Sequence, residues 1–561
     1  MCPTTGLFAF ASRAAGLSRI RGQGLGFRQG LLPHNTLEYP IRHTLPHTLP
    51  ASIGNRCFRF MTTALAANCP TPPSIIEDGI VRTIEGGSLP LSPSQRRTIY
   101  ALATPPGKAG VGVIRISGPK VKDVYAKMIK PTSTSARNRG GTLPNPTKME
   151  RCEVINPETQ EVLDDGLVVY FAAPRSFTTE DVLELHIHSG RAIITAIEAA
   201  LSRIPGCRPA ERGEFTRRAF EAGRMDFTQV EGLRDLIEAE TSVQRTLALH
   251  AAQGLTSQRF QQLRDQIIYA LAMVESIIDF GEGEGIEDGV WETAQDRVRQ
   301  LRAAVHMHLD DDRRGEILRS GIRLAIFGPP NAGKSSLLNF LAHREAAIVT
   351  PLPGTTRDVL ELSLDIGGMP VVVADTAGLR NTEDVVEAIG VDRAQQTATL
   401  ADITICVLSI PEILANPIPD AITKLISPST IVLLNKCDIA HDIPESTLSN
   451  LIPDIAGAWW QGSVNTGTGM PEFMQGLAYV LQSRFDISHP DREPLITHAR
   501  HRVHLESTLR YLDAFLQLGA EDVVLAAEEL RYAAQEVGRV SGAVGVEDIL
   551  DTVFKTFCIG K

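Results

Sequence analysis

The sequence of 561 residues contains no run of eighteen apolar residues, which is about the length that a helix needs to cross a bilayer. We therefore expect no membrane span. Cysteine is also sparse, and the eight cysteines are scattered, with neither the close pairs of a metal-binding motif nor the density of a disulfide framework. These absences argue against a disulfide-rich secreted domain and indicate a reducing compartment.

Acidic residues are almost missing from the first 75 positions, where Glu38 is the only one beside seven arginines. Serine, threonine and glycine are common in the same stretch. This composition is typical of a mitochondrial transit peptide, although a plain disordered tail is the alternative. We expect residues 1–75 to be a leader that directs the protein to the mitochondrial matrix.

A basic excess is absent as well, because the formal net charge of the chain is −11. The chain as a whole is therefore not built like a nucleic-acid binder, although a local basic face is compatible with this total. Its hydrophobic fraction of 43% and charged fraction of 22% are ordinary for a globular protein. The length is too great for one core and predicts about three domains.

The segment from about Thr98 to Glu240 mixes short strands with helices. Apolar and alternating runs predict strands, and three-to-four spacing of apolar residues predicts a helix from Ala192 to Ile204. This mixture favours a small α+β domain. The predicted strands are Ile99–Ala103, Val111–Ile116, Leu167–Phe171 and Val182–His188.

Three polar side chains, those of Glu184, His186 and His188, share one face of the last of these strands. A metal site is conceivable, but no further cluster of ligands is near in the sequence. A hydrogen-bonded surface is the favoured interpretation, with Glu184 as a residue that holds a polar ligand as the alternative.

Helical periodicity runs through residues 230–320 and returns from about Pro494 to the end. The simplest architecture is one helical domain made from both stretches, with the intervening segment inserted as a domain of its own. Insertion is tolerated where the ends of the inserted domain lie close together.

The inserted segment opens with an apolar run, Ile322–Phe327, followed by Gly328-Pro329-Pro330-Asn331-Ala332-Gly333-Lys334-Ser335 and then a helical pattern. Strand, Gly-x-x-x-x-Gly-Lys-Ser and helix is the context of a phosphate-binding loop, although a chance glycine-rich turn is the alternative. In such a loop, backbone amides surround phosphate oxygens. Lys334 would reach the outer phosphates, and the Ser335 hydroxyl would be a ligand of Mg2+.

Two further motifs follow at spacings that suit the same fold. The stretch Gly354–Asp358 contains threonines that can meet Mg2+ and a γ-phosphate. The strand Val371–Ala374 ends in Asp375-Thr376-Ala377-Gly378, where Asp375 can hold Mg2+ through water and Gly378 can offer its amide to the γ-phosphate. Together with the first loop, they predict a doubly wound, largely parallel nucleotide-binding domain.

The base should be guanine. The strand Ile431–Leu434 leads into Asn435-Lys436-Cys437-Asp438, and the Asp438 carboxylate can accept two hydrogen bonds from a guanine edge that adenine cannot supply. Ser463-Val464-Asn465 follows where this fold contacts the base from a last loop. We therefore predict a GTPase.

One position departs from the Ras-like pattern. Leu379 follows Gly378, at the place where such enzymes carry a glutamine that orients the attacking water. Another group must take over this task, and the acidic candidates are Glu383, Asp384 and Glu387. The alternative is that these acids only form a solvated surface, and residue chemistry alone does not choose among them.

Three stretches outside the GTPase motifs carry a resemblance. They are Ala103–Gly107 with Gly110–Gly112 and Arg115–Gly118, then Arg208-Pro209 with Gly213–Phe220, and the C-terminal Phe557-Cys558-Ile559-Gly560-Lys561. With them, the chain from about Thr98 to Lys561 resembles the MnmE family of GTPases that modify the wobble uridine of tRNA. The arginine-rich leader suits a mitochondrial member.

The resemblance implies an N-terminal domain that binds 5-formyl- or methylene-tetrahydrofolate and forms a homodimer. The positions that match the family's folate contacts are Arg115, Glu184, Arg224 and Lys561, and Cys558 matches a cysteine suspected of a chemical role. The family usually has lysine where this chain has Arg224, so the charge is kept but the geometry differs.

The resemblance also selects Glu387 as the catalytic residue, and it implies that K+ replaces an arginine finger when two GTPase domains meet. The matching K+ ligands are Asn331, Thr350, Leu352 and Thr355, and the Mg2+ ligands are Ser335, Thr356 and, through water, Asp375. The GTP-binding positions are Gly328, Asn331, Ala332, Gly333, Lys334, Ser335, Ser336, Thr350, Thr355, Thr356, Asp375, Thr376, Ala377, Gly378, Asn435, Lys436, Asp438, Ser463, Val464 and Asn465.

The family acts with an FAD-containing MnmG-type flavoprotein, in a heterotetramer, to install an aminomethyl-type group on C5 of the uridine. Two other functions stay open. A ribosome-assembly GTPase would require an RNA-binding domain after residue 485, where the tail is helical and not notably basic, and a regulatory switch would use GTP only to set affinity for an effector. The expected domains are 96–225 for folate, 226–320 with 487–561 for the helical domain, and 321–486 for the GTPase.

Overall fold

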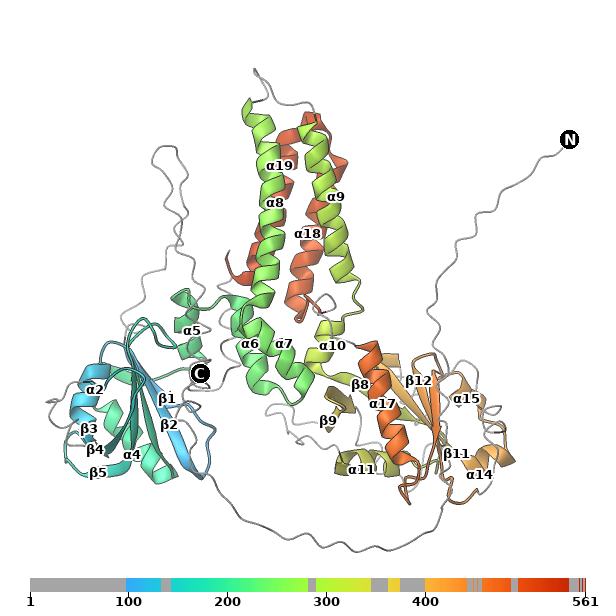
Figure 1. The fold of residues 1–561 in the computed structure, drawn as a ribbon, viewed down its shortest axis with the longest axis horizontal. Helices are drawn as coiled ribbons and strands as arrows, with labels where there is room; N and C mark the ends of the chain where they lie inside the picture. The colour runs from blue at the N-terminus through green and yellow to red at the C-terminus, as the bar shows by residue number, and fades with distance from the viewer. Residues whose placement is uncertain are drawn as a thin grey trace, which may run out of the picture. The chain divides into compact units, whose positions relative to one another are not determined.

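The fold is taken from a computed structural model (Figure 1). It describes residues 97–132, 143–280, 289–344, 362–373, 399–440, 457–485 and 493–543, together with residues 447, 452, 554, 557 and 560. Contacts within the chain divide it into two compact units. One contains Arg323–Leu362 and Val373–Leu477, and the other contains Asp78–Ile322, Ser363–Val372 and Ala478–Lys561.

An N-terminal sheet of seven strands lies in the second unit, in the order β3-β4-β5-β6-β2-β1-β7. Its bounds are β1 Thr98–Leu102, β2 Ala109–Ser117, β3 Ile129–Pro131, β4 Met149–Ile155, β5 Val162–Phe171, β6 Val182–Ser189 and β7 Cys207–Pro209. The strands are antiparallel except where β1 pairs with β7. This arrangement suits a sheet that buries one face and leaves the other partly open.

The buried face of this sheet is apolar and is covered by α2 (Val121–Met128) and α4 (Arg191–Ser202). Ile114, Leu185 and Ile187 belong to this core. Alternate residues point to the opposite face because side chains alternate along a strand. We call this opposite surface, which carries Arg115, Glu184 and His186, the open face.

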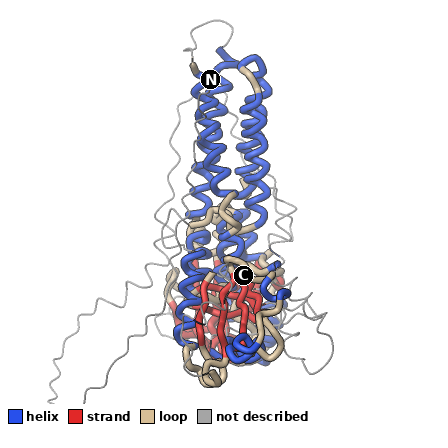
Figure 2. Tube along the Cα trace, turned by 90° about the vertical axis from the view of Figure 1, so that its right-hand side faces the viewer, coloured by secondary structure: helices blue, strands red, loops and turns tan. Residues whose placement is uncertain are grey.

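Long helices form a bundle in the same unit, and they run side by side in Figures 1 and 2. They are α8 Leu255–Phe280, α9 Val290–Leu309, α18 Ala499–Gln517 and α19 Val523–Ser541, which share one apolar core. Shorter helices precede them or follow α9: α5 Glu214–Glu221, α6 Phe227–Glu238, α7 Ser242–Ala252 and α10 Arg314–Ser320. Capping boxes begin α6, at Asp226 with Gln229, and α7, at Thr241 with Gln244.

A second sheet has the order β13-β12-β11-β8-β10-β9. Its strands are β8 Ile322–Phe327, β9 Leu362–Ile366, β10 Met369–Val373, β11 Ile403–Ser409, β12 Thr430–Asn435 and β13 Ala458–Gln461, with helices α11 Lys334–Arg344, α14 Ile410–Ala415, α15 Asp420–Thr423 and α17 Met470–Arg484. Strands β8, β11, β12 and β13 are parallel. Every residue of β11 is buried, as expected of a central parallel strand.

The predicted fold class is confirmed: an α+β domain, a helical domain and a Ras-like α/β domain with its phosphate-binding loop. Each predicted strand in the described residues is present, whereas β3, β4, β7, β9, β11 and β13 were not predicted. Among the described residues, no helix has the length and apolar character that crossing a membrane requires. The expected leader, residues 1–75, lies outside the described residues.

Candidate functional sites

The loop between β8 and α11 has a backbone that only particular residues can adopt. Gly328 has a φ of +149°, and a Cβ there would lie 2.1 Å from the carbonyl oxygen of Val407. Gly333 has a φ of +105°, and a Cβ there would lie 2.1 Å from the side-chain nitrogen of Asn435. Both glycines of the motif are therefore required by close approach of another strand, as well as by their dihedral angles.

Lys334 begins α11 and folds back over this loop. Its Nζ donates hydrogen bonds to the carbonyl oxygens of Gly328 at 3.0 Å and Pro329 at 2.7 Å. Burial lowers the pKa of Lys334 from its ordinary value. An ammonium group held at the mouth of a loop of backbone amides is suited to the outer phosphates of a nucleotide.

Asn435, at the end of β12, joins two loops of the site. Its side-chain nitrogen donates to the carbonyl oxygen of Ala332 at 2.8 Å, and its side-chain oxygen accepts from the backbone N–H of Val464 at 3.1 Å. The phosphate-binding loop and the Ser463–Val464 turn are thus fixed to one buried side chain. The sequence pattern placed Asn435 at the nucleotide but did not indicate this bridging role, which links residues 103 positions apart.

Asp438 supplies the orphaned polar atom of this site. Its Oδ1 is buried and has no hydrogen-bond partner in the part of the chain that the structure describes. An unsatisfied buried acceptor costs about 1–3 kcal/mol. A ligand edge with two N–H donors would relieve that cost, and guanine presents such an edge. The residues present therefore fit a guanine nucleotide.

The structure describes only some of the remaining predicted GTPase residues. Asn331 has a φ of +57° and is exposed at the tip of the loop, and Ser335, Ser336, Lys436, Ser463 and Asn465 belong to the elements just described. Thr350, Leu352, Thr355, Thr356, Asp375, Thr376, Ala377, Gly378, Leu379 and Glu387 lie outside the described residues.

Arg115 and Glu184 meet on the open face of the N-terminal sheet. The Nε of Arg115 donates to Glu184 at 2.9 Å across the paired strands β2 and β6. The Arg115 guanidinium lies 5.2 Å from the centre of the Phe177 ring and 5.8 Å from that of Phe215. Burial alone would raise the pKa of Glu184, but His186 and Arg115 outweigh it and hold this pKa below its ordinary value.

A carboxylate beside a guanidinium, on a partly open apolar surface, suits the pterin end of a folate. The carboxylate can accept from pterin N–H groups, and the guanidinium beside it keeps that carboxylate ionised. Arg224 lies in the exposed turn between α5 and α6, and no contact in the described residues joins it to Arg115 or Glu184. Lys561 and Cys558 lie outside the described residues.

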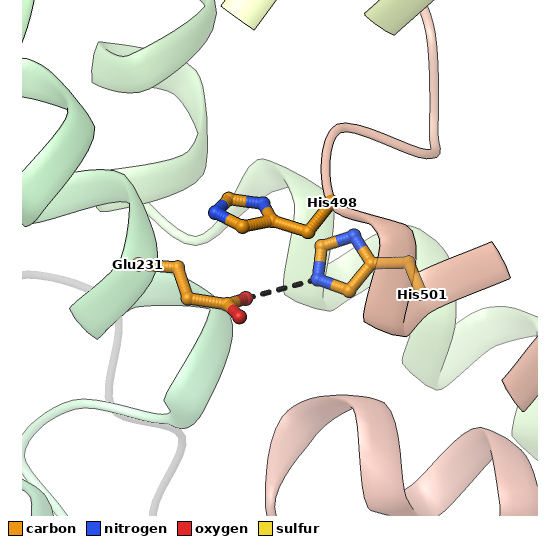
Figure 3. A group of neighbouring side chains, drawn as sticks. All are labelled: Glu231, His498 and His501. Atoms are coloured by element: carbon orange, nitrogen blue, oxygen red, sulfur yellow. Dashed lines mark hydrogen bonds and ion pairs between the residues drawn. The ribbon is translucent and has the colours of Figure 1, made fainter. Parts of the chain in front are cut away.

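A third group of titratable side chains, which the sequence pattern did not indicate, lies in the helical region (Figure 3). Glu231 of α6 accepts a hydrogen bond from His501 Nε2 at 2.9 Å, and the ring of His498 lies beside that of His501. Burial lowers the pKa of His498 to about 3 and also lowers that of His501. Two neutral imidazoles and a carboxylate resemble the ligand set of a divalent metal.

Two arginine side chains, which already pair with the carboxylates of this cluster, argue against a metal site here. Arg500 donates to both carboxylate oxygens of Glu231, at 3.1 and 2.9 Å. Arg319 donates to both oxygens of Asp235, which is also 3.4 Å from His498. Both carboxylates are already neutralised, so a divalent cation would add two uncompensated charges to a buried site. We therefore interpret the cluster as a buried ion-pair network.

The chain is similar to two described families and to curated proteins of bacteria and mitochondria. A family described as "MnmE helical domain" matches residues 227–558, and one described as "GTP-binding protein TrmE N-terminus" matches residues 98–224. The protein named tRNA modification GTPase MnmE in Parvibaculum lavamentivorans is 44% identical over 83% of this chain and 100% of its own length. The mitochondrial protein of Danio rerio named 5-taurinomethyluridine-[tRNA] synthase subunit GTPB3 is 41% identical over 83% of this chain and 93% of its own length.

Proposed function

Because this chain belongs to the MnmE family of tRNA modification GTPases, we propose that it hydrolyses GTP while installing an aminomethyl-type group on C5 of the wobble uridine of mitochondrial tRNA. The observation that carries the GTP part is the buried Oδ1 of Asp438, which has no hydrogen-bond partner among the described residues. Strand β12, which precedes Asp438, ends in Asn435, and the Asn435 side chain is hydrogen-bonded to the phosphate-binding loop. The residues for base recognition and for phosphate binding therefore meet at the end of β12.

In this proposal, each side of the nucleotide has its own residues. Asp438 accepts from the guanine edge, and Lys334 turns from its two carbonyl partners toward the β- and γ-phosphates. Ser335, Thr356 and, through water, Asp375 would hold Mg2+, which would supply positive charge at the phosphates. Lys334 starts from a partly desolvated position, where its charge is screened less than it would be in water.

Replacing Asp438 by asparagine is expected to weaken GTP binding by about tenfold to a hundredfold, because the pair of accepted hydrogen bonds is lost. Xanthosine triphosphate, which presents an acceptor where guanine presents its amino group, should bind the variant better than GTP. Titration with a fluorescent nucleotide measures both affinities. Equal GTP affinity in Asp438→Asn and wild type would contradict the assignment of Asp438 to the base.

Hydrolysis needs a group that orients water, because Leu379 cannot do so. We assign this role to Glu387, which lies beyond the Asp375 motif in the sequence. Asn331, Thr350, Leu352 and Thr355 would hold K+, which supplies positive charge where negative charge develops between the phosphates. Asn331 suits this role because it is exposed at the loop tip, in a left-handed conformation that asparagine tolerates.

The open face of the N-terminal sheet supports a homodimer. Met149 is 54% exposed and Leu167 37%, and they accompany Arg115 and Glu184 on this face by strand register. Adjacent exposed apolar side chains mark an interaction surface. We propose that two copies pair through this face and bind 5-formyl- or methylene-tetrahydrofolate there, through Arg115, Glu184, Arg224 and Lys561.

A tetrahydrofolate bound there would supply the one-carbon unit, and the protein would act with an FAD-containing MnmG-type partner in a heterotetramer. The arginine-rich leader and the mitochondrial relatives of zebrafish and Dictyostelium discoideum support action in the mitochondrial matrix. Cys558 is the candidate for an additional chemical role near the C-terminus.

Nucleoside mass spectrometry of mitochondrial tRNA tests the whole proposal. Cells without this protein are expected to contain wobble uridines that lack the aminomethyl-type group, and re-expression of the wild type should restore it. The mass of the restored nucleoside will also tell whether the amine is glycine, taurine or ammonium. Unmodified and modified levels that do not change on deletion would refute the function while leaving the GTPase intact.

A further inference from the structure

His186 and His188 look equivalent in the sequence but differ in the structure. His188 is engaged: its Nδ1 is 2.8 Å from Asp164 Oδ1, and its backbone N–H donates to Asp164 Oδ2 at 2.8 Å. His186 makes a longer ion-pair contact, in which its Nε2 lies 3.8 Å from Glu184 Oε2. That separation is too long for a hydrogen bond. The side chain of His186 is 23% exposed and belongs to the same open face as the Arg115–Glu184 pair.

Along the strands, the open face is accessible on one side of Glu184. Towards the start of β6 the next pair is Val182 with Ser117, and these residues are 1% and 0% exposed. In the other direction the next row is Val113, His186 and Leu167, and Leu167 is 37% exposed. A flat ligand held by Glu184 that extends along the strands therefore lies over the row of His186.

The spacing of the rows suits a pterin. Residues two apart on one strand face lie about 6.7 Å apart, which is comparable to the length of the bicyclic pterin ring. A pterin whose pyrimidine edge is bonded to Glu184 would therefore bring its reduced ring, with the nitrogen that carries the one-carbon unit, above His186.

Gly560, near the C-terminus, lies beside the same row. A Cβ at Gly560 would lie 2.2 Å from the carbonyl oxygen of Leu102 and 2.9 Å from the Cα of Ala103. The N–H of Ala103 donates to the carbonyl oxygen of Val113 at 2.7 Å, and Val113 is the strand neighbour of His186. Gly560, which precedes the expected folate residue Lys561, thus lies at the end of the row that contains His186.

We propose that His186 is a further folate-binding residue, whose Nε2 forms a hydrogen bond with the reduced ring or its one-carbon group and positions that group above the sheet. This inference rests on the proposed binding of tetrahydrofolate to Arg115 and Glu184. His186 is thereby assigned to ligand positioning, and no proton transfer is assigned to it.

The test compares substitutions at the two histidines in the full-length protein. Binding of 5-formyltetrahydrofolate is measured by isothermal titration calorimetry for wild type, His186→Leu, His186→Gln and the matched control His188→Leu. His186→Leu is expected to raise Kd about tenfold, since one hydrogen bond to the ligand is lost. His186→Gln, whose amide reaches the position of Nε2, should stay within about threefold of wild type, and His188→Leu should match it. Light scattering and GTP turnover check that the dimer and the GTPase are intact.

The outcomes separate the inference from the function on which it rests. If wild type does not bind 5-formyltetrahydrofolate, the proposed folate site fails, and the role of His186 fails with it. If wild type binds and His186→Leu binds equally well, the folate site stands and the assignment of His186 is wrong. If His186→Leu does not dimerise, the test is instead the comparison of His186→Asn with His186→Gln. The glutamine amide reaches the position of Nε2, whereas the asparagine amide reaches only the position of Nδ1. Weaker binding by the asparagine variant alone supports the proposal, and equal binding by the two overturns it.

Discussion

GTP turnover by this protein is expected to rise at least about tenfold when K+ replaces Na+ at equal ionic strength, and substitution of Asn331 is expected to abolish the rise. Removing one preorganised electrostatic group from a transition state commonly costs a factor of about 10²–10³ in rate. Leu379 provides no substitute for a water-orienting glutamine, so hydrolysis depends strongly on the added cation. Steady-state phosphate release in the two salts measures the effect.

The conformation of Asn331 determines which variants are informative. Its φ of +57° is left-handed, and alanine there would add about 1 kcal/mol of backbone strain that has nothing to do with a cation. Asn331→Gly removes the side chain without that strain, so it should be compared with Asn331→Ala. Asn339, which is exposed on α11, gives the control variant Asn339→Ala with the same chemical change outside the loop.

The expected pattern is loss of the K+ response in both Asn331 variants, with the full response retained in Asn339→Ala. Equal rates of GTP turnover in K+ and Na+ for the wild type would contradict the assignment of a K+ site. A wild-type response that persists in Asn331→Gly would place the cation on other ligands.

The sequence was most informative where the chemistry is local. The phosphate-binding loop is specified by eight consecutive residues, and its glycines are required by dihedral angles and close contacts at their own positions. The central strands could be predicted for a similar reason, because burial on both faces produces an uninterrupted apolar run such as Ile431–Leu434. Edge strands such as β3 and β7, with three residues each, give no such run.

Features that depend on distant pairing were not predictable. His186 and His188 have the same residue type and the same strand face, yet only His188 meets Asp164, which the pairing of β5 with β6 brings near. In the same way, Glu231 and His501 are 270 residues apart. No local pattern marks either residue, because their partner is supplied by the packing of α6 against the start of α18.

The buried ion-pair network around Arg500 joins parts of the helical region that are far apart in sequence. Besides its two bonds to Glu231 on α6, Arg500 donates to the carbonyl oxygens of Arg539 at 3.0 Å and Val540 at 2.9 Å, near the end of α19. Its guanidinium also lies 4.4 Å from the centre of the Phe227 ring. One side chain therefore holds the beginning of α18 to both α6 and the last turn of α19.

Arg500→Met is expected to lower the free energy of unfolding of the helical region by about 3–5 kcal/mol, because it leaves Glu231 as a buried charge without its guanidinium partner. The matched control is Arg531→Met, which breaks an ion pair with Glu275 whose side chains are 46% and 43% exposed and should cost no more than about 1 kcal/mol. The measurement uses the fluorescence of Trp291, which packs on Phe515 within the bundle. The chain has three tryptophans, so the other two are replaced in a Trp459→Phe/Trp460→Phe background.

The double variant Glu231→Leu/Arg500→Met should recover part of the loss, because replacing both charges leaves less unpaired charge in the interior. If Arg500→Met unfolds in denaturant at the same midpoint as Arg531→Met, the network does not hold these helices together.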